Sequence, residues 1–184
     1  PSRGLGDVYK RQLLEVYFDG QGYAQKDEIA QVRKYHKNPN MWDYFLRTRI
    51  AVDSLEDLLD EKEGNLDKVQ MLFADMEERE EAWKELEREG VFELVGSLQY
   101  NIEINAVGVN KGTGLVNLGK MLGIRREEIM ACGDGDNDIA MLKEVGFGVA
   151  MANAEEKVKA VADYITESNN DEGVAKAIEK FVLK

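Results

Sequence analysis

The chain has 184 residues, of which 43% are hydrophobic and 33% are charged, a balance typical of a folded protein and not of a disordered one. Its 36 acidic residues outnumber 24 basic ones, and the formal net charge of -12 disfavours a nucleic-acid partner. No apolar run approaches the roughly 18 residues that a transmembrane helix needs, so we expect no membrane partner and a cytoplasmic location. The single cysteine, Cys132, excludes an intrachain disulfide and a four-cysteine zinc site.

The first twelve residues differ from the rest of the chain. The stretch 1–12 (PSRGLGDVYKRQ) shows no hydrophobic periodicity and is locally basic within an acidic protein. We interpret it as a leader that is foreign to the fold, with a native interdomain linker as the alternative. At the other end, Val174, Ala177, Ile178 and Phe181 recur at helical spacing, so we expect a native terminal helix.

Residues 13–110 mix strand and helix patterns. In chain order, the pattern first predicts a strand at 13–18 that stops at an Asp19-Gly20 turn, a helix at 26–37 that ends before Pro39, and a helix at 54–59 capped by Ser54. A strand at 69–74, a helix at 77–89 that ends at Gly90, and a strand at 98–104 follow. Apolar and polar residues alternate in the last strand, which is typical of an antiparallel sheet with one buried face. We therefore expect an α+β domain built on a sheet.

From Lys111 onward, helices and short apolar strands alternate. A helix with Leu115, Leu118 and Leu122 precedes a strand at 129–132, and further helices separate and follow strands at 147–151 and 164–165. Such alternation is typical of a parallel sheet covered by helices on both faces. We therefore predict an α/β protein in three parts: the leader at 1–12, the α+β domain at 13–110, and a parallel-sheet core at 111–184.

One acidic segment carries the clearest chemical signal. Gly133-Asp134-Gly135-Asp136-Asn137-Asp138 follows a buried strand and precedes a helix, at the carboxyl edge where open α/β sheets bind ligands. Its three carboxylates repel one another unless water or a cation offsets their charge. Asp134 and Asp138 are four residues apart and can converge if the helix starts early. Carboxylate oxygens suit Mg²⁺, which binds one or two of them together with phosphate oxygens, and a solvated acidic loop is the alternative.

Three other motifs resemble parts of this half, and each of them fails. An EF-hand loop that starts at Asp134 would need Gly at position six and Glu at position twelve, where the chain has Ile139 and Val145. The stretch from Gly114 to Lys120 imitates a phosphate-binding P-loop, but Met121 stands in place of the required hydroxyl residue. A dinucleotide fingerprint from Gly112 breaks at Asn117.

A family resemblance links the remaining signals. Lys111 opens a helix, where its ammonium group could donate to phosphate oxygens, although an exposed lysine is the ordinary reading. The segments 111–115 (KGTGL), 133–138 (GDGDND) and 148–154 (GVAMANA) resemble, in order and spacing, the last motifs of the haloacid dehalogenase (HAD) superfamily, and in particular its Cof-type phosphatases. This resemblance covers nearly everything after Gln12. It implies the C-terminal part of a HAD-like Rossmannoid core at 111–184 and a cap domain at 13–110.

The resemblance also implies a role for four residues. Lys111 matches the lysine that steadies the nucleophile and the transferring phosphoryl group, and Asp134 matches a Mg²⁺ ligand. Asp138 matches its acidic companion near the metal, and Asn137 matches an amide that orients phosphate or the loop around it. The family's chemistry is attack by an aspartate on a phosphomonoester, followed by hydrolysis of the aspartyl-phosphate. We therefore expect a Mg²⁺-dependent phosphatase that acts on a small phosphorylated metabolite, since a closing cap sequesters small molecules. No oligomeric state is predicted.

The family's nucleophile motif, D-x-D-G-T, does not occur in this chain. Tyr17-Phe18-Asp19-Gly20 comes nearest, but Tyr17 stands in place of the nucleophile and the stretch suits a hairpin turn. The nucleophile and the acid/base aspartate are therefore expected outside these 184 residues, and we expect the chain alone to be inactive. Because the missing segment would supply the central strand, we also expect the strand at 129–132 to be unpaired on one side.

Two alternatives stay open, a non-catalytic remnant that acts as a binding or interaction module and a plain divalent-ion-binding domain. Other conspicuous residues favour structural roles. We expect His36 on a helix surface, Cys132 packed in its buried strand, and Trp42 in the core of the first domain, with a substrate pocket as the alternative for Trp42.

Overall fold

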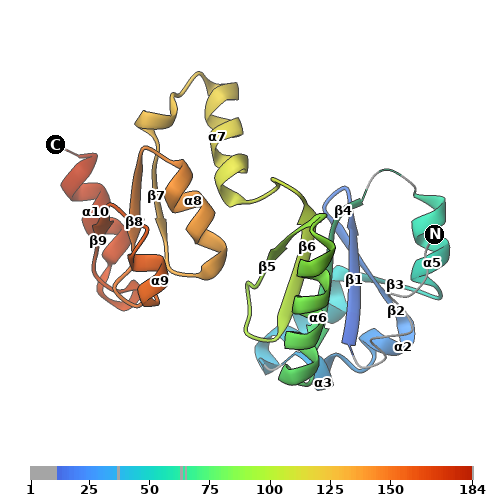
Figure 1. The fold of residues 1–184 in the computed structure, drawn as a ribbon. Coiled ribbons are helices and arrows are strands. Elements are labelled where there is room, and N and C mark those ends of the chain that lie inside the picture. The colour runs from blue at the N-terminus through green and yellow to red at the C-terminus, as the bar shows by residue number, and fades with distance from the viewer. Residues whose placement is uncertain (1–11, 37, 63, 65, 184) are drawn as a thin grey trace. The chain divides into compact units, whose positions relative to one another are not determined.

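The computed structural model describes residues 12–36, 38–62, 64 and 66–183, which form two compact units that divide between Val107 and Gly108 (Figure 1). We call residues up to Val107 the first unit and those from Gly108 the second unit. The expected leader at 1–12 lies outside the described residues, except that Gln12 is the first residue of a strand.

The first unit is built on a six-stranded sheet. Its strands lie in the order β3-β2-β1-β4-β6-β5, and all neighbours are antiparallel except β2 and β3. The bounds are β1 Gln12–Phe18, β2 Gln21–Gln25, β3 Arg49–Val52, β4 Leu66–Phe73, β5 Phe92–Val95 and β6 Asn101–Ala106. The expected turn joins β1 to β2, with φ angles of 51° at Asp19 and 74° at Gly20. These values suit a tight hairpin, so the hairpin prediction for Tyr17-Phe18-Asp19-Gly20 is confirmed.

The described residues of this unit also form short or medium helical segments beside the sheet: α2 Lys26–Ile29, α3 Val32–Tyr35, η1 Pro39–Met41, α4 Trp42–Thr48, α5 Leu55–Glu61 and α6 Met76–Glu89. The single helix predicted at 26–37 is wrong, because the chain forms two helices there. The side-chain amide of Gln31 donates to the Asp27 carbonyl, which a continuous helix would offer to the main chain. Ser54 and Gly90 cap α5 and α6 as expected.

The core of the first unit lies on both faces of the sheet. Leu13 and Leu72 pack with α2, α3 and α4 on one face, in a cluster that includes Val32 and Phe45. On the opposite face, a second cluster packs against α6, and its fully buried members are Met71, Phe73, Ala82 and Ile102. The alternation of side chains along β4 produces this division, since Leu72 points away from both Met71 and Phe73.

His36 is buried, at 2% relative exposure, so its predicted place on a helix surface is wrong. The chain leaves α3 at Tyr35 and turns His36 inward between the rings of Phe45 and Tyr100, whose centroids lie 4.6 and 5.4 Å away. The Tyr100 hydroxyl lies 3.0 Å from Nδ1 of His36. The indole N–H of Trp42, which is partly buried against the same cluster, donates to the His36 carbonyl.

The second unit contains a parallel sheet of three strands in the order β7-β8-β9. Its strands are β7 Met130–Gly133, β8 Phe147–Ala150 and β9 Tyr164–Ile165. Its helical segments are α7 Lys111–Leu122, η2 Arg126–Glu128, η3 Asp136–Asp138, α8 Ile139–Glu144, α9 Glu156–Lys159, η4 Asn169–Asp171 and α10 Gly173–Phe181. The alternation of helix and strand expected for this half is confirmed.

Helices cover both faces of this sheet. Leu142 of α8 packs against Ala150 of β8 on one face. On the other face, the ring of Phe181 in α10 lies 4.7 Å from Phe147 and 5.0 Å from Tyr164, between ring centroids. Because successive side chains of a strand point to opposite faces, Phe147 and Ala150 mark the two sides.

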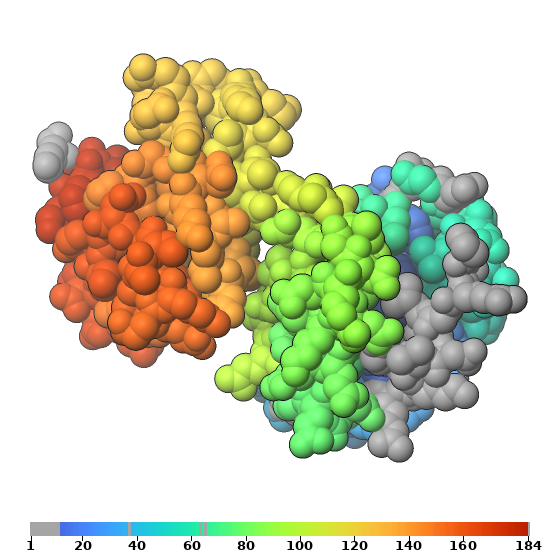
Figure 2. Space-filling model, viewed as in Figure 1, coloured from blue at the N-terminus to red at the C-terminus, as the bar shows by residue number. Residues whose placement is uncertain are grey.

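Strand β7 is an edge strand within the part of the chain that the structure describes, since only β8 pairs with it. Three apolar side chains of the nearby helix α7 are exposed: Leu118, Met121 and Leu122. Residues of α7 and its exit form the yellow surface in Figure 2. The expected apolar stripe of α7 is therefore largely open to solvent. No helix among the described residues is long and apolar enough to cross a membrane.

Candidate active site

The acidic segment lies where the sequence placed it. Strand β7 ends at Gly133, the backbone continues through Asp134 and Gly135 into the 3-10 turn η3, and helix α8 begins at Ile139. The segment therefore stands at the carboxyl edge of a parallel sheet, where side chains from successive strands can meet a ligand.

Lys111 and Asp138 form an ion pair, with Nζ of Lys111 2.6 Å from Oδ1 of Asp138. Lys111 is the first residue of α7, and the side chain of Asn110 caps this helix by accepting hydrogen bonds from two backbone N–H groups. The close approach of α7 to α8 requires glycine at position 112, because a Cβ there would lie 2.8 Å from the Ala140 carbonyl oxygen. The lysine side chain remains about half exposed, so its ammonium group keeps donors for a second partner.

Asp138 is buried, and both of its carboxylate oxygens are engaged. Oδ1 binds Lys111, and Oδ2 accepts the backbone N–H groups of Asp134 and Gly135 at 3.0 Å each. Burial alone would raise the pKa of Asp138, but the hydrogen bonds from Lys111 and from the two backbone groups outweigh it and hold the pKa below its usual value. Asp138 is therefore an anion that fixes both the lysine and the backbone of the loop.

Asp136 pairs with a different lysine. Nζ of Lys157, in α9, lies 2.6 Å from Oδ2 of Asp136, and both side chains are about half exposed. The hydrogen bond to Asp136 raises the pKa of Lys157, so the lysine is a cation at neutral pH. Sequence reasoning missed Lys157, since a contact across 21 residues leaves no local pattern.

Asp134 contacts a neutral group instead. Nδ2 of Asn153, in the loop after β8, donates to Oδ2 of Asp134 at 2.8 Å. Within the described residues, no cation lies at ion-pair distance from Asp134, and no group donates to its Oδ1. Of the three aspartates, Asp134 alone therefore has no described cationic partner.

Comparison with known proteins agrees with the resemblance read from the sequence. The sequence model of the haloacid dehalogenase-like hydrolase family matches residues 10–178. The chain belongs to this family. It is 50% identical, over 105 residues, to 5-amino-6-(5-phospho-D-ribitylamino)uracil phosphatase YcsE of Bacillus subtilis. That alignment covers 57% of the chain and 42% of the relative.

Two solved structures of HAD proteins show the same fold. A haloacid dehalogenase-like hydrolase from B. subtilis matches with a TM-score of 0.74 and 28% identity, over 93% of this chain and 65% of that one. The HAD subclass IIB sugar phosphatase BT4131 matches with a TM-score of 0.69 and 25% identity, over 94% of this chain and 62% of that one. The predicted α/β fold and the HAD resemblance are therefore confirmed. The chain spans less than half of the Bacillus phosphatase and under two thirds of each solved protein.

Asn137, the fourth residue singled out in the HAD motif, lies in η3 between the two engaged aspartates. Its side-chain amide makes no hydrogen bond to any residue that the structure describes. It is half-buried, and the absence of a side chain at Gly135 leaves room for it, since a Cβ there would lie 2.7 Å from the Asn137 Oδ1. The amide is therefore available to a ligand at the same loop as Asp134.

The donor set fits Mg²⁺ only in part. Asp134 offers a carboxylate oxygen, the kind of ligand that Mg²⁺ prefers, whereas Asp138 has committed both of its oxygens to Lys111 and the backbone. No group of three or more metal-binding side chains is found in the described part of the chain. One carboxylate is compatible with Mg²⁺, because this ion keeps several waters and takes its other ligands from phosphate oxygens.

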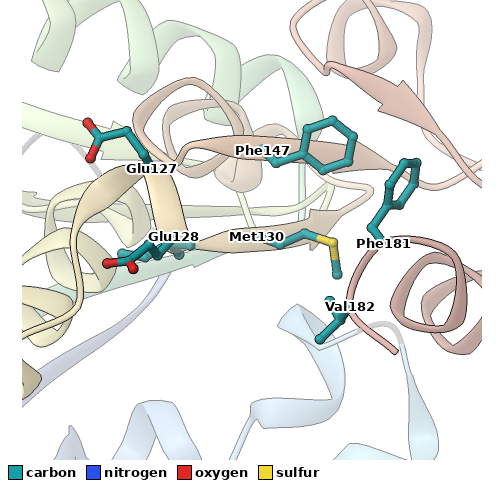
Figure 3. A pocket seen from close by; sticks show the side chains of 7 residues that line it. Glu127, Glu128, Met130, Phe147, Phe181 and Val182 are labelled. Carbon is teal, nitrogen blue, oxygen red and sulfur yellow. The ribbon is translucent and has the colours of Figure 1, made fainter. Parts of the chain in front are cut away.

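A pocket of about 450 Å³ lies elsewhere in the second unit (Figure 3). Met130 and Phe147, the first residues of β7 and β8, line it together with Phe181 and Val182 at the end of α10. The pocket therefore stands at the amino edge of the parallel strands, opposite to the loop that contains Asp134. We do not assign it to the candidate site, since ligands of open α/β sheets bind at the carboxyl edge.

Proposed function

We propose that this HAD-family chain carries part of the active site of a Mg²⁺-dependent phosphomonoester hydrolase whose substrate is a small phosphorylated metabolite. One observation carries the proposal: at the carboxyl edge of the sheet, Asp138 binds Lys111 through one oxygen and the backbone N–H of Asp134 through the other, and the Asp134 carboxylate has no described cationic partner. A half-exposed cation and a metal-binding oxygen are what a transferring phosphoryl group requires. The first unit takes the role of the cap.

Each residue has a distinct role in this proposal. Asp134 would hold Mg²⁺ through Oδ1, and the ion would supply charge stabilisation for the phosphoryl oxygens. Lys111 donates to the same phosphoryl group, with Asp138 as the anion that orients it. The amide of Asn137 orients the phosphate from within the loop. Asp138 would not coordinate the metal directly. It would shape the metal site by accepting hydrogen bonds from the backbone of Asp134 and Gly135.

The proposal places the nucleophile outside this chain. HAD phosphatases, as the resemblance implies, attack the phosphomonoester with an aspartate and then hydrolyse the aspartyl-phosphate. The sequence contains no D-x-D-G. In the stretch most similar to that motif, Tyr17-Phe18-Asp19-Gly20, the place of the nucleophile is taken by Tyr17, which lies in β1 of the first unit. We therefore expect the 184-residue chain to bind Mg²⁺ and phosphate without turning over substrate.

The experiment is a titration of the ¹⁵N-labelled chain with Mg²⁺, with and without inorganic phosphate, followed by NMR. We expect saturable shifts of the amide signals of Asp134, Gly135 and Asn137, and tighter Mg²⁺ binding when phosphate is present. Asp134→Asn should abolish these shifts. Asp136→Asn is the matched control, since it removes one carboxylate of the same loop that is already paired with Lys157.

Three outcomes would contradict the proposal in different ways. Shifts that do not saturate, or that leave Asp134 unaffected, would exclude a metal site in this loop. Mg²⁺ binding that phosphate does not strengthen would favour the plain divalent-ion-binding domain. Mg²⁺-dependent hydrolysis of p-nitrophenyl phosphate by the chain alone, lost in Asp134→Asn, would show that a nucleophile is present after all.

A further inference from the structure

We infer that Asn153 is the positioning residue of the metal site, because it fixes the carboxylate of Asp134 so that the other oxygen faces the ion. This inference rests on the proposed function. Nδ2 of Asn153 donates to Oδ2 of Asp134 at 2.8 Å, which leaves Oδ1 without a described partner. A carboxylate held through one oxygen loses most of its rotational freedom, so less entropy is lost when the second oxygen binds a cation.

Asn153 is itself held in place. Its Oδ1 accepts the backbone N–H of Asn169 at 2.9 Å, so both ends of the amide are engaged. Asp134 follows β7, Asn153 follows β8 and Asn169 follows β9, so the two hydrogen bonds cross the carboxyl edge of the whole three-stranded sheet. Backbone hydrogen bonds from Met151 to Gly133 and from Ala152 to Glu167 hold the same three strand ends together. Hydrogen bonds therefore hold Asn153 at the joined ends of all three strands.

The chemistry of the partner matters as much as its position. Lys111 and Lys157 neutralise Asp138 and Asp136, and a carboxylate paired with an ammonium group is a poor metal ligand, because the cation must first be displaced. The amide of Asn153 donates a hydrogen bond without adding positive charge. Asp134 thereby keeps its full negative charge and a defined direction, which is the combination that a divalent cation requires.

The test measures metal affinity rather than activity. Mn²⁺, a paramagnetic substitute for Mg²⁺, is titrated into the ¹⁵N-labelled 184-residue chain, and the broadening of the Gly135 amide signal gives the affinity. Three variants separate the contacts. Asn153→Ala removes the donor to Asp134. Asn169→Pro removes the backbone N–H that anchors Asn153, together with the Asn169 side chain. The site suits proline, because it is the first position of η4 and the preceding Ser168 is already extended. Asn169→Ala is the matched control, because it keeps that N–H.

We expect Asn153→Ala to weaken Mn²⁺ binding by about 10- to 100-fold, as the loss of a residue that orients a metal ligand commonly does. Asn169→Pro should weaken binding by a smaller factor, and Asn169→Ala should match the wild type. A purely structural Asn153 would lower the unfolding midpoint of the second unit but leave the Mn²⁺ affinity of the folded chain unchanged.

Two outcomes would overturn the inference, and they differ. Wild-type affinity in both Asn153→Ala and Asn169→Pro would refute the positioning role while leaving the metal site intact. Absence of Mn²⁺ broadening at Gly135 in the wild type would refute the proposed function itself, and the inference with it.

Discussion

The ammonium nitrogen of Lys111 lies 2.6 Å from Oδ1 of Asp138, across 27 residues of sequence, and this ion pair joins the start of α7 to the loop after β7. The pair is unequal, since the lysine is half exposed whereas the aspartate is buried. Removing the aspartate should therefore have a larger effect than its single salt bridge suggests.

We expect Asp138→Asn to lower the free energy of unfolding of the second unit by about 1.5–3 kcal/mol, the usual contribution of hydrogen bonds to a charged group. The substitution keeps the size of the side chain but leaves Lys111 without its counter-charge. Hydrogen exchange at the Val149 amide in β8 would measure the free energy of unfolding of this unit. Asp136→Asn, which breaks an exposed ion pair, should cost less than about 1 kcal/mol. Equal effects of the two variants would contradict the prediction.

The first unit contains an ion pair in which both side chains are largely buried. Nε of Arg49 lies 3.0 Å from Oε1 of Glu15, which is fully buried, and the Tyr17 hydroxyl donates to Glu15 while accepting from Arg49. Burial, followed by the charge of Glu15, raises the pKa of Tyr17. Arg49→Leu should cost about 3–5 kcal/mol, because it leaves a buried carboxylate unpaired.

Tryptophan fluorescence during urea unfolding would measure the effect of Arg49→Leu, since Trp42 and Trp83, the two tryptophans of the chain, both lie in the first unit. Adding Glu15→Leu to Arg49→Leu should recover part of the loss, because it removes the unpaired charge. Lys26→Ala, which breaks the exposed pair with Asp53, serves as the control. A loss no larger than that of the control would contradict the prediction.

His36 should make the stability of the first unit depend on pH. Burial lowers the pKa of His36 below its ordinary value, and the nearby charge of Arg49 lowers it further. The unfolded chain therefore takes up a proton near pH 6.5, before the folded chain does. Stability is complete above that pH and falls as the pH decreases toward the pKa of the folded state.

The prediction for His36 can be measured directly, because the chain has a single histidine. We expect its imidazole signals to titrate below pH 6.5 in an NMR experiment. In His36→Asn, the difference in unfolding free energy between pH 7.5 and pH 5.5 should be smaller than in the wild type. An imidazole that titrates near 6.5 would contradict the burial that the structure assigns to it.

The second unit should self-associate. Strand β7 offers an unpaired edge among the described residues, and Met121, at 84% exposure, lies with Leu118 and Leu122 on the open side of α7. Edges and apolar patches of this kind promote association. We expect sedimentation velocity to show concentration-dependent oligomers that Met121→Lys reduces. Val91→Lys, at an exposed apolar residue of the first unit, is the control. A monodisperse wild type at high concentration would contradict the prediction.

Local patterns predicted the fold and part of the candidate site. The alternation of helices and strands after Lys111 predicts a parallel sheet. Asp134 directly follows a strand of this sheet, so it must lie at the carboxyl end of that strand. Patterns did not predict what each aspartate contacts. Asn153 and Lys157 reach the acidic loop across 19 and 21 residues, so only the packing of β8 and α9 against that loop brings them there.

The wrong prediction for His36 has a similar cause, since local patterns do not show which elements pack together. A lone histidine among polar residues suggests a surface, but the turn after α3 carries His36 into the core. Likewise, Leu118 and Leu122 recur at helical spacing, and this spacing shows which side of α7 could be buried, not whether a partner covers it. The burial of His36 and the exposure of these leucines both depend on which elements pack together, and periodicity does not describe that.

The absence of a side chain at Gly133 limits how the acidic loop can change by mutation. A Cβ there would lie 2.5 Å from the Cβ of Asp138. Every other amino acid has a Cβ, so any codon change that alters this residue forces Asp138 away from Lys111 and from the two backbone groups it binds. A saturation-mutagenesis scan of stability would therefore find position 133 as intolerant as Asp138, although glycine takes no part in the chemistry.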